Sequence, residues 1–196
     1  MMAAGGVHHA VMLREAVEGL KVRADGVYVD GTFGAGGYST AILDANRHVR
    51  VLALDRDPTA IAAAAPRVAR FAGRLTLVEA PFSRMAEVVA GSSLTPVSGV
   101  VLDIGVSSMQ IDTAARGFSF MADGPLDMRM GTDGPTVAEL IASAGEELIA
   151  DVIFHLGEER QARRIARTIV RARDETPITT TRRLAAIVEQ IGRAHV

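Results

Sequence analysis

Short apolar runs alternate with segments of helical periodicity over the first half of the chain. Short apolar runs predict a buried strand at residues 27–29 and further strands at residues 52–55, 74–79 and 97–103. Apolar residues three and four positions apart predict helices at residues 11–20, 40–43, 59–68 and 85–90. Strands that alternate with helices in this way predict an α/β fold with a parallel, doubly wound sheet.

The pattern changes after the fourth apolar run. Residues 104–135 are rich in Gly, Ser, Asp and Pro, which predicts loops. Helical periodicity then returns in four segments, at residues 137–143, 146–156, 158–173 and 181–190. We therefore expect a sheet domain over residues 1–106 and a helical insertion over residues 107–190.

A glycine-rich segment follows the first predicted strand. Asp30 ends that strand, and Gly34, Gly36 and Gly37 precede the next predicted helix. A strand, a glycine-rich turn and a helix form an arrangement in which backbone N–H groups approach a ligand closely. The second strand ends in Asp55, 18 residues after Gly37, near the spacing at which a carboxylate binds ribose hydroxyls. These features favour a nucleoside-binding βαβ unit over a tight turn without a ligand.

Three of the predicted strands end in an acid: Asp30, Asp55 and Asp103. In a doubly wound sheet the carboxyl ends of the strands converge on the ligand crevice, although a single strand-end acid can equally cap a helix. A dinucleotide would use the first two acids as well. The GxGxxG spacing typical of dinucleotide sites is not met, so the glycines favour a methyl donor.

The composition excludes several classes of site. The chain has no cysteine, so disulfides and thiolate metal sites are excluded, and its 5 histidines lack metal-ligand spacing, so we expect no metal. The net charge of −2 means that an RNA partner requires a local basic patch. The sequence shows no signal peptide and no apolar run of membrane-spanning length, so we expect a cytoplasmic protein with no membrane partner.

Arginines gather on one face of the helix predicted over residues 158–173. They are Arg160, Arg163, Arg164, Arg167 and Arg171, and an apolar stripe lies on the opposite face. Such a face is often only solvated. The lack of acidic residues from 160 to 173 favours phosphate binding here.

Longer phrases of the sequence resemble a known family. They lie at residues 8–15, 28–37, 102–112, 116–120, 123–130 and 157–159, and include Asp103-Ile104-Gly105-Val106-Ser107-Ser108 and Asp123-Gly124-Pro125-Leu126-Asp127-Met128-Arg129-Met130. Together they resemble the bacterial family that methylates N4 of a decoding-region cytidine in 16S ribosomal RNA with S-adenosylmethionine. The resemblance covers residues 8–188. It implies a Rossmann-like methyltransferase fold, the small ribosomal subunit as partner and, as an option, a homodimer.

The resemblance also implies cofactor contacts at matching positions: Gly36, Gly37, Tyr38, Asp55, Phe82, Asp103 and Gln110. In this family Asp55 corresponds to the ribose-binding acid and Phe82 to a residue beside the adenine. Tyr38 departs from the family, which usually has His at this position. Since a Tyr can still offer its backbone N–H, we expect cofactor binding to survive, but not a role for an imidazole.

The resemblance places the chemistry and the RNA contacts in the loops beyond the fourth strand and in the insertion. Asp103 is the candidate acceptor of a hydrogen bond from the N4 amine, with cofactor binding alone as the alternative. Phe118 and Phe120 either stack on a flipped-out base or pack as core residues that fix the insertion to the sheet. The full set of candidate substrate contacts is Arg116, Phe118, Phe120, Asp127, Arg129, Arg160, Arg164 and Arg167.

The end of the sequence has an unusual feature. Residues 191–196 correspond to the translation of a widely used sequencing adapter, so we expect them not to be natural protein and the chain to be C-terminally truncated.

Two alternative functions stay open. One is an RNA-binding or assembly module that holds the cofactor without catalysis, and the other is an NAD(P)-dependent oxidoreductase, which the glycine spacing disfavours.

Overall fold

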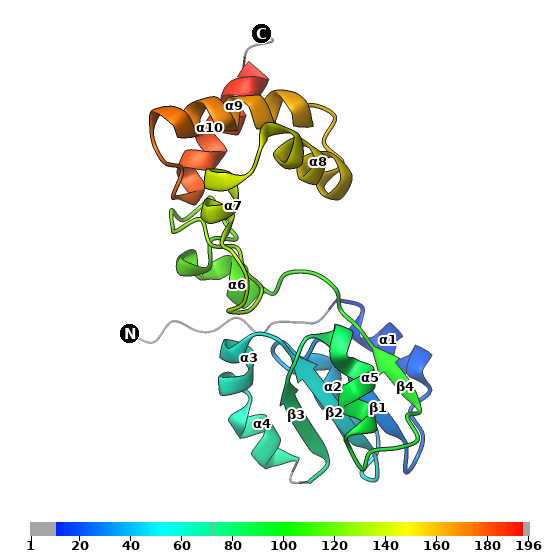
Figure 1. Cartoon of the computed structure of the whole chain (residues 1–196). Helices are drawn as coiled ribbons and strands as arrows, with labels where there is room; N and C mark the ends of the chain where they lie inside the picture. Colours follow the sequence, from blue (N-terminus) through cyan, green and yellow to red (C-terminus); the bar gives the residue numbers. More distant parts are fainter. Residues whose placement is uncertain (1–10, 72, 194–196) are drawn as a thin grey trace. The chain divides into compact units, whose positions relative to one another are not determined.

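The chain divides into two compact units, which are described separately (Figure 1). The structure is a computed structural model that describes residues 11–71 and 73–193. The sheet unit comprises Met1–Gly105 with Met130–Thr132, and the helical unit comprises Val106–Arg129 with Asp133–Val196. Residues 130–132 thus return to the sheet unit from within the second half of the chain, which the sequence did not predict.

The sheet unit is built on four parallel strands in the order β3-β2-β1-β4. The strands are β1 (Val27–Asp30), β2 (Arg50–Asp55), β3 (Leu75–Glu79) and β4 (Gly99–Val101). The prediction of a parallel α/β sheet is therefore confirmed. The fourth strand is shorter than the predicted 97–103, because its partner β1 ends at Asp30, opposite Val101. Beyond that pair, residues 102 and 103 have no strand to pair with.

Helices cover both faces of this sheet, as expected for a doubly wound fold (Figure 1). They are α1 (Leu13–Leu20), α2 (Gly37–Ala45), α3 (Pro58–Ala63), α4 (Ala65–Arg70) and α5 (Met85–Ala90), with a 3₁₀ turn η1 (Phe82–Arg84). Apolar residues of α1, α2 and α4 pack with Tyr28 on one face. Residues of α5 pack with Val27 and Val29 on the other face. Alternate side chains of β1 therefore enter two separate cores.

One helix predicted in this unit is divided in two. Residues 59–68 were expected to form a single helix, but α3 ends at Ala63 and α4 begins at Ala65. Pro66 lies in the first turn of α4. A proline has no N–H to donate to the residue four positions earlier, so the hydrogen-bond ladder is interrupted there.

The helical unit contains α6 (Ser108–Asp112), η2 (Ala114–Arg116), α7 (Val137–Ser143), α8 (Glu146–Gly157), α9 (Ala162–Glu175) and α10 (Thr181–Arg193). Its core is formed mainly by isoleucines of α7 to α10 and by Leu126. The helix predicted from residue 158 begins only at Ala162. Glu158 takes a left-handed conformation, φ 53°, and its N–H bonds to Ile153 O, which ends α8 and turns the chain.

Two findings concern predictions about the end of the chain and about membranes. α10 continues past the predicted end at residue 190, and the Ile191 side chain is buried against the helical unit's core. The proposed origin of residues 191–196 stays a prediction, and 194–196 lie outside the described residues. Within the described part of the chain, no helix is both long enough and apolar enough to span a membrane.

Candidate functional site

The glycine-rich turn runs from Gly31 to Gly36 between β1 and α2. Gly34 and Gly36 have φ values of 51° and 76°, in the left-handed region that glycine adopts without strain. A Cβ at Gly36 would lie 2.7 Å from Phe33 Cζ and 2.9 Å from Arg67 Cδ, so this position lacks room for a side chain. A Cβ at Gly34 would meet only Thr32 O, at 3.9 Å. The turn is therefore closed on its inner side and open at Gly34.

Asp30 holds the two ends of this turn together from inside the protein. Its Oδ2 accepts hydrogen bonds from Ser39 Oγ at 2.7 Å and Ser39 N at 3.2 Å, and its Oδ1 accepts one from Thr32 N at 3.2 Å. The side chain is fully buried. We expected Asp30 to add charge to the ligand crevice. Because it is buried and already accepts three hydrogen bonds, its role is to fix the turn.

Burial raises the pKa of the Asp30 carboxyl to about 6, against the lowering effect of its hydrogen bonds. In the unfolded chain the carboxyl releases its proton near its ordinary pKa of 3.8. Between these two values the folded protein binds more protons than the unfolded chain, so stability falls as the pH rises and levels off above pH 6.

We predict that this loss amounts to about 2 kcal/mol between pH 4.5 and 7.5, and that Asp30→Asn removes it. The comparison is between the pH dependences of the two proteins, since the amide also changes the hydrogen bonds at every pH. Urea unfolding can be followed by tyrosine fluorescence, which reports the sheet unit because both tyrosines, Tyr28 and Tyr38, lie there. Parallel pH profiles for the two proteins would contradict the prediction.

Asp55 connects the end of β2 to the glycine turn. Its Oδ2 accepts a hydrogen bond from Gly34 N at 2.6 Å, and its Oδ1 accepts one from Asp57 N at 2.8 Å. Asp57 in turn caps α3 through Thr59 N. Each carboxylate oxygen has a second lone pair, so Asp55 can also accept bonds from the hydroxyls of a ligand at the open side of Gly34.

Tyr38 uses its side chain for packing. The ring is buried, its hydroxyl donates a hydrogen bond to Val11 O, and burial together with the charges of Asp103 and Asp30 raises its pKa. Tyr38 and Gly37 lie in the first turn of α2, where N–H groups have no partner within the helix. Of the first-turn groups, the Ser39 N–H is bound by Asp30. The Tyr38 backbone N–H lies at the start of the helix, and its predicted contact with a cofactor stays a prediction.

Phe82 and Asp103 lie beside the first residues of the same turn. A Cβ at Gly31 would lie 3.3 Å from Phe82 Cβ, and the Asp103 N–H donates to Thr32 Oγ1 at 2.7 Å. Phe82 is 42 % exposed, and Asp103 is exposed as well. Asp103 was predicted as the last residue of a strand, but it follows the end of β4 by two residues. The structure thus gathers Gly36, Gly37, Tyr38, Asp55, Phe82 and Asp103 around one edge of the sheet.

Gln110 belongs to the helical unit, where its side chain caps a helix. The Gln110 side-chain Oε1 accepts a hydrogen bond from the Ser107 backbone N–H at 2.9 Å, and the Gln110 backbone N–H donates to Ser107 Oγ at 3.2 Å. These two bonds form a capping box at the start of α6. The predicted cofactor contact of Gln110 stays a prediction.

The helical unit brings together three of the predicted substrate residues. Arg129 donates from Nε and Nη2 to the two carboxylate oxygens of Asp127, at 2.9 and 2.8 Å, and Arg116 Nη2 donates to Arg129 O at 2.9 Å. The Arg129 guanidinium lowers the pKa of Asp127 to about 2. Phe118 is half-buried and Phe120 is 62 % exposed, and neither ring belongs to the helical unit's core.

The arginine face of α9 begins later in the sequence than predicted. Arg160 lies in the turn before the helix, so the helical face begins at Arg163. Arg164 is half-buried, and Arg167 Nε lies 3.4 Å from Glu146 Oε1 of α8. The sequence showed no acid between residues 160 and 173. The structure supplies one from another helix, which offsets part of the positive charge.

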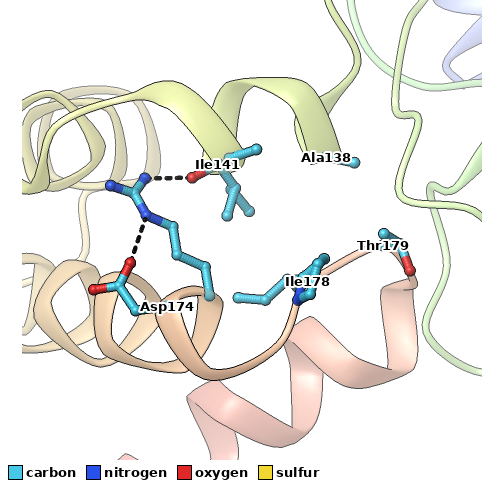
Figure 2. Close-up of a pocket in the computed structure, with 8 residues that line it drawn as sticks. Ala138, Ile141, Asp174, Ile178 and Thr179 are labelled. Carbon is cyan, nitrogen blue, oxygen red and sulfur yellow. Dashed lines mark hydrogen bonds and ion pairs between the residues drawn. The ribbon is translucent and has the colours of Figure 1, made fainter.

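The described residues contain no group of three or more His, Asp or Glu side chains able to hold a metal ion. A cavity of about 180 Å³ lies in the helical unit between α7, the end of α9 and the segment that follows it (Figure 2). Arg173 lines it and donates to Ile141 O and Ala144 O at 2.5 and 2.6 Å, which caps the end of α7. None of the predicted site residues lines this cavity.

Sequence reasoning missed Thr32 and Ser39 as parts of the site. Both have hydroxyl groups within the glycine-rich segment, but many residues in such turns have polar side chains. Only the hydrogen bonds to Asp30 and Asp103 distinguish these two.

Comparisons with known proteins bear on the family of this chain. The sequence matches the model of the MraW methylase family over residues 6–195. A protein of Bradyrhizobium diazoefficiens named ribosomal RNA small subunit methyltransferase H is 58% identical over 187 residues, which cover 95% of this chain and 56% of that protein. A protein of the same name from Xanthobacter autotrophicus is 59% identical over 191 residues, covering 96% and 55%.

The chain spans about half the length of the curated relatives that it matches. Among solved structures, an rRNA methylase from Streptococcus thermophilus is 20% identical, with a TM-score of 0.35 and 52% of each chain covered. A likeness at that level is too loose to add to the fold described above.

Proposed function

The chain belongs to the MraW methylase family, and on this basis we propose that the protein transfers a methyl group from S-adenosylmethionine to 16S ribosomal RNA of the small subunit. The proposed target atom is the exocyclic N4 of a decoding-region cytidine. The observation that carries the proposal is the hydrogen bond between Gly34 N and Asp55 Oδ2. It joins a glycine turn and a strand-end acid at one edge of a parallel sheet, where a nucleoside cofactor binds in such folds.

The residues of the sheet unit fit this cofactor. The open side of Gly34 leaves room for a ligand against the main chain. In our proposal the backbone of Gly36, Gly37 and Tyr38 binds the amino-acid end of the cofactor, Asp55 binds the ribose hydroxyls, and Phe82 packs on the adenine. Asp103 completes the contacts that we propose for this unit, and the predicted contact of Gln110 stays a prediction. The family favours a methyl donor over the nicotinamide cofactor of the oxidoreductase alternative.

When bound, S-adenosylmethionine would supply an electrophilic methyl group for in-line attack by the amine, with S-adenosylhomocysteine as the leaving group and with loss of one proton from N4. The lone pair of a cytidine N4 is delocalised into the ring, so the protein has to orient the amine. We propose that the exposed carboxylate of Asp103 accepts a hydrogen bond from N4 and holds it in line with the methyl group. Cofactor binding alone remains the alternative role of Asp103.

The helical unit is our proposed RNA-binding part. Arg160, Arg164 and Arg167 are proposed to contact phosphates, and Phe118 and Phe120 to stack on bases. The Asp127 carboxylate accepts hydrogen bonds from the backbone N–H, Nε and Nη2 of Arg129, so we assign this pair, with Arg116, to shaping the loop that carries Phe118 and Phe120. The partner would be the small ribosomal subunit in the cytoplasm, and a homodimer stays a prediction.

The test is methyl transfer with a full-length protein that contains this sequence. Small subunits lacking the modification are incubated with S-adenosylmethionine labelled in its methyl group, and the RNA is digested to nucleosides. We expect the label in N4-methylcytidine. Label in another nucleoside would overturn the target, and a folded protein that binds S-adenosylhomocysteine but transfers nothing would favour the assembly-module alternative.

A further inference from the structure

We propose that Thr32 is a positioning residue that holds Asp103 at the edge of the cofactor site. The proposal rests on the proposed function for the role of Asp103, and on the structure for the contact. The Asp103 N–H donates to Thr32 Oγ1 at 2.7 Å, across 71 residues of sequence. Thr32 is itself fixed, because its own N–H donates to Asp30 Oδ1 at 3.2 Å. A chain of contacts thus runs from the buried acid of β1 to an exposed acid beyond β4.

Asp103 needs such an anchor because the sheet no longer holds it. The last main-chain bond between the glycine turn and this segment is Gly31 N to Val101 O, at 3.0 Å. Residues 102 to 105 are exposed, and no other hydrogen bond of Asp103 is found among the described residues. The Thr32 hydroxyl therefore determines where the chain leaves β4 and where the Asp103 side chain begins.

A second contact brings the same two segments together. A Cβ at Gly31 would lie 2.4 Å from Leu102 Cδ2, so the Leu102 side chain packs directly on the backbone of the turn. Burial raises the pKa of Tyr38 in α2, and the negative charge of Asp103 contributes to this shift. The Leu102 side chain packs on the turn at Gly31, and the Thr32 hydroxyl accepts the hydrogen bond that holds Asp103.

The proposal predicts that Thr32→Val acts through Asp103. Valine has the shape of threonine but no acceptor oxygen, and water replaces the lost bond at the exposed Asp103 N–H. We expect S-adenosylhomocysteine to bind about tenfold more weakly, and Thr32→Ser to restore binding to within about threefold. The double variant Thr32→Val/Asp103→Ala should bind no more weakly than Asp103→Ala alone.

Thr40→Val is the matched control. Thr40 lies in α2, close in sequence to the same turn, and its Oγ1 is buried without a hydrogen-bond partner. Removing that oxygen should leave S-adenosylhomocysteine binding unchanged. Isothermal titration gives the affinities of all variants, and tyrosine fluorescence during urea unfolding confirms that the sheet unit stays folded.

Additive effects of Thr32→Val and Asp103→Ala would overturn the proposal, as would unchanged binding in Thr32→Val. A wild-type chain that is folded but binds no S-adenosylhomocysteine would instead contradict the proposed cofactor. In that case hydrogen exchange of the Asp103 amide decides the role of Thr32. Faster exchange in Thr32→Val than in Thr40→Val supports the anchor, and equal exchange overturns it.

Discussion

Asp55→Ala is expected to weaken S-adenosylhomocysteine binding at least about a hundredfold. Two hydrogen bonds from ribose hydroxyls to a carboxylate contribute roughly 3 kcal/mol together, which corresponds to that factor. The substitution also removes the acceptor of the Gly34 N–H, 2.6 Å away in the structure. The loss therefore combines missing ligand contacts with a loosened glycine turn. Isothermal titration of the ligand into the wild-type chain and the variant measures it.

Asp55→Asn separates these two effects. The amide oxygen can still accept the Gly34 N–H, but the charge and one acceptor are lost, so we expect an affinity between those of the wild type and of Asp55→Ala. Asp44→Ala is the control, since Asp44 is an exposed acid of the same unit that pairs with Arg70 at 2.9 Å. Equal affinities for the wild type and Asp55→Ala would show that Asp55 does not bind the cofactor.

Gly117→Ala is expected to destabilise the helical unit by about 3 kcal/mol. Gly117 has φ 73°, which an alanine adopts only with strain. A Cβ there would also lie 2.5 Å from Pro125 O and 2.8 Å from Asp127 N. Both are backbone atoms, so relief requires the chain around residues 125–128 to move. That movement would disturb the loop in which Asp127 and Arg129 pair.

Gly134→Ala provides a matched comparison, because Gly134 has a similar φ of 81° but no atom within 4 Å of its Cβ position. It should cost only the strain of the left-handed backbone, about 1 kcal/mol. Urea unfolding followed by far-UV circular dichroism gives both free energies. A difference between the variants of less than about 1 kcal/mol would show that the backbone contacts of Gly117 relax without cost.

Several elements were predictable because their signals are local. β1 and β2 are buried parallel strands, and such strands are continuous apolar runs that a sequence reveals directly. β3 pairs in parallel with β2 at the edge of the sheet and is only partly buried. The glycine turn and Asp55 follow from the same logic, since a parallel sheet brings strand ends to one edge. The fourth strand was predicted too long because its apolar pattern continues past the point at which its partner ends.

Other features depended on residues that are distant in sequence. Asp30 was expected to face a ligand, but the covering helix α2 buries it and supplies Ser39 as its partner. The sequence from residue 160 to 173 contains no acid, but in the structure Glu146 of α8 lies next to Arg167 of α9. The periodicity of a single helix cannot predict such a pair, because the pair depends on how two helices pack.

The sequence by itself determined the α/β class, the family and the acid that marks the proposed cofactor site. These depend on periodicity, on strand-end residues and on long characteristic motifs, and each of these signals lies within a short, continuous stretch of sequence. Only the tertiary structure decided which polar groups are bonded to one another. Asp103 bonds to Thr32, 71 residues away in sequence, and Asp55 bonds to Gly34, 21 residues away. These contacts form because β1 pairs in parallel with both β2 and β4, which brings the ends of strands that are distant in sequence to the same edge of the sheet.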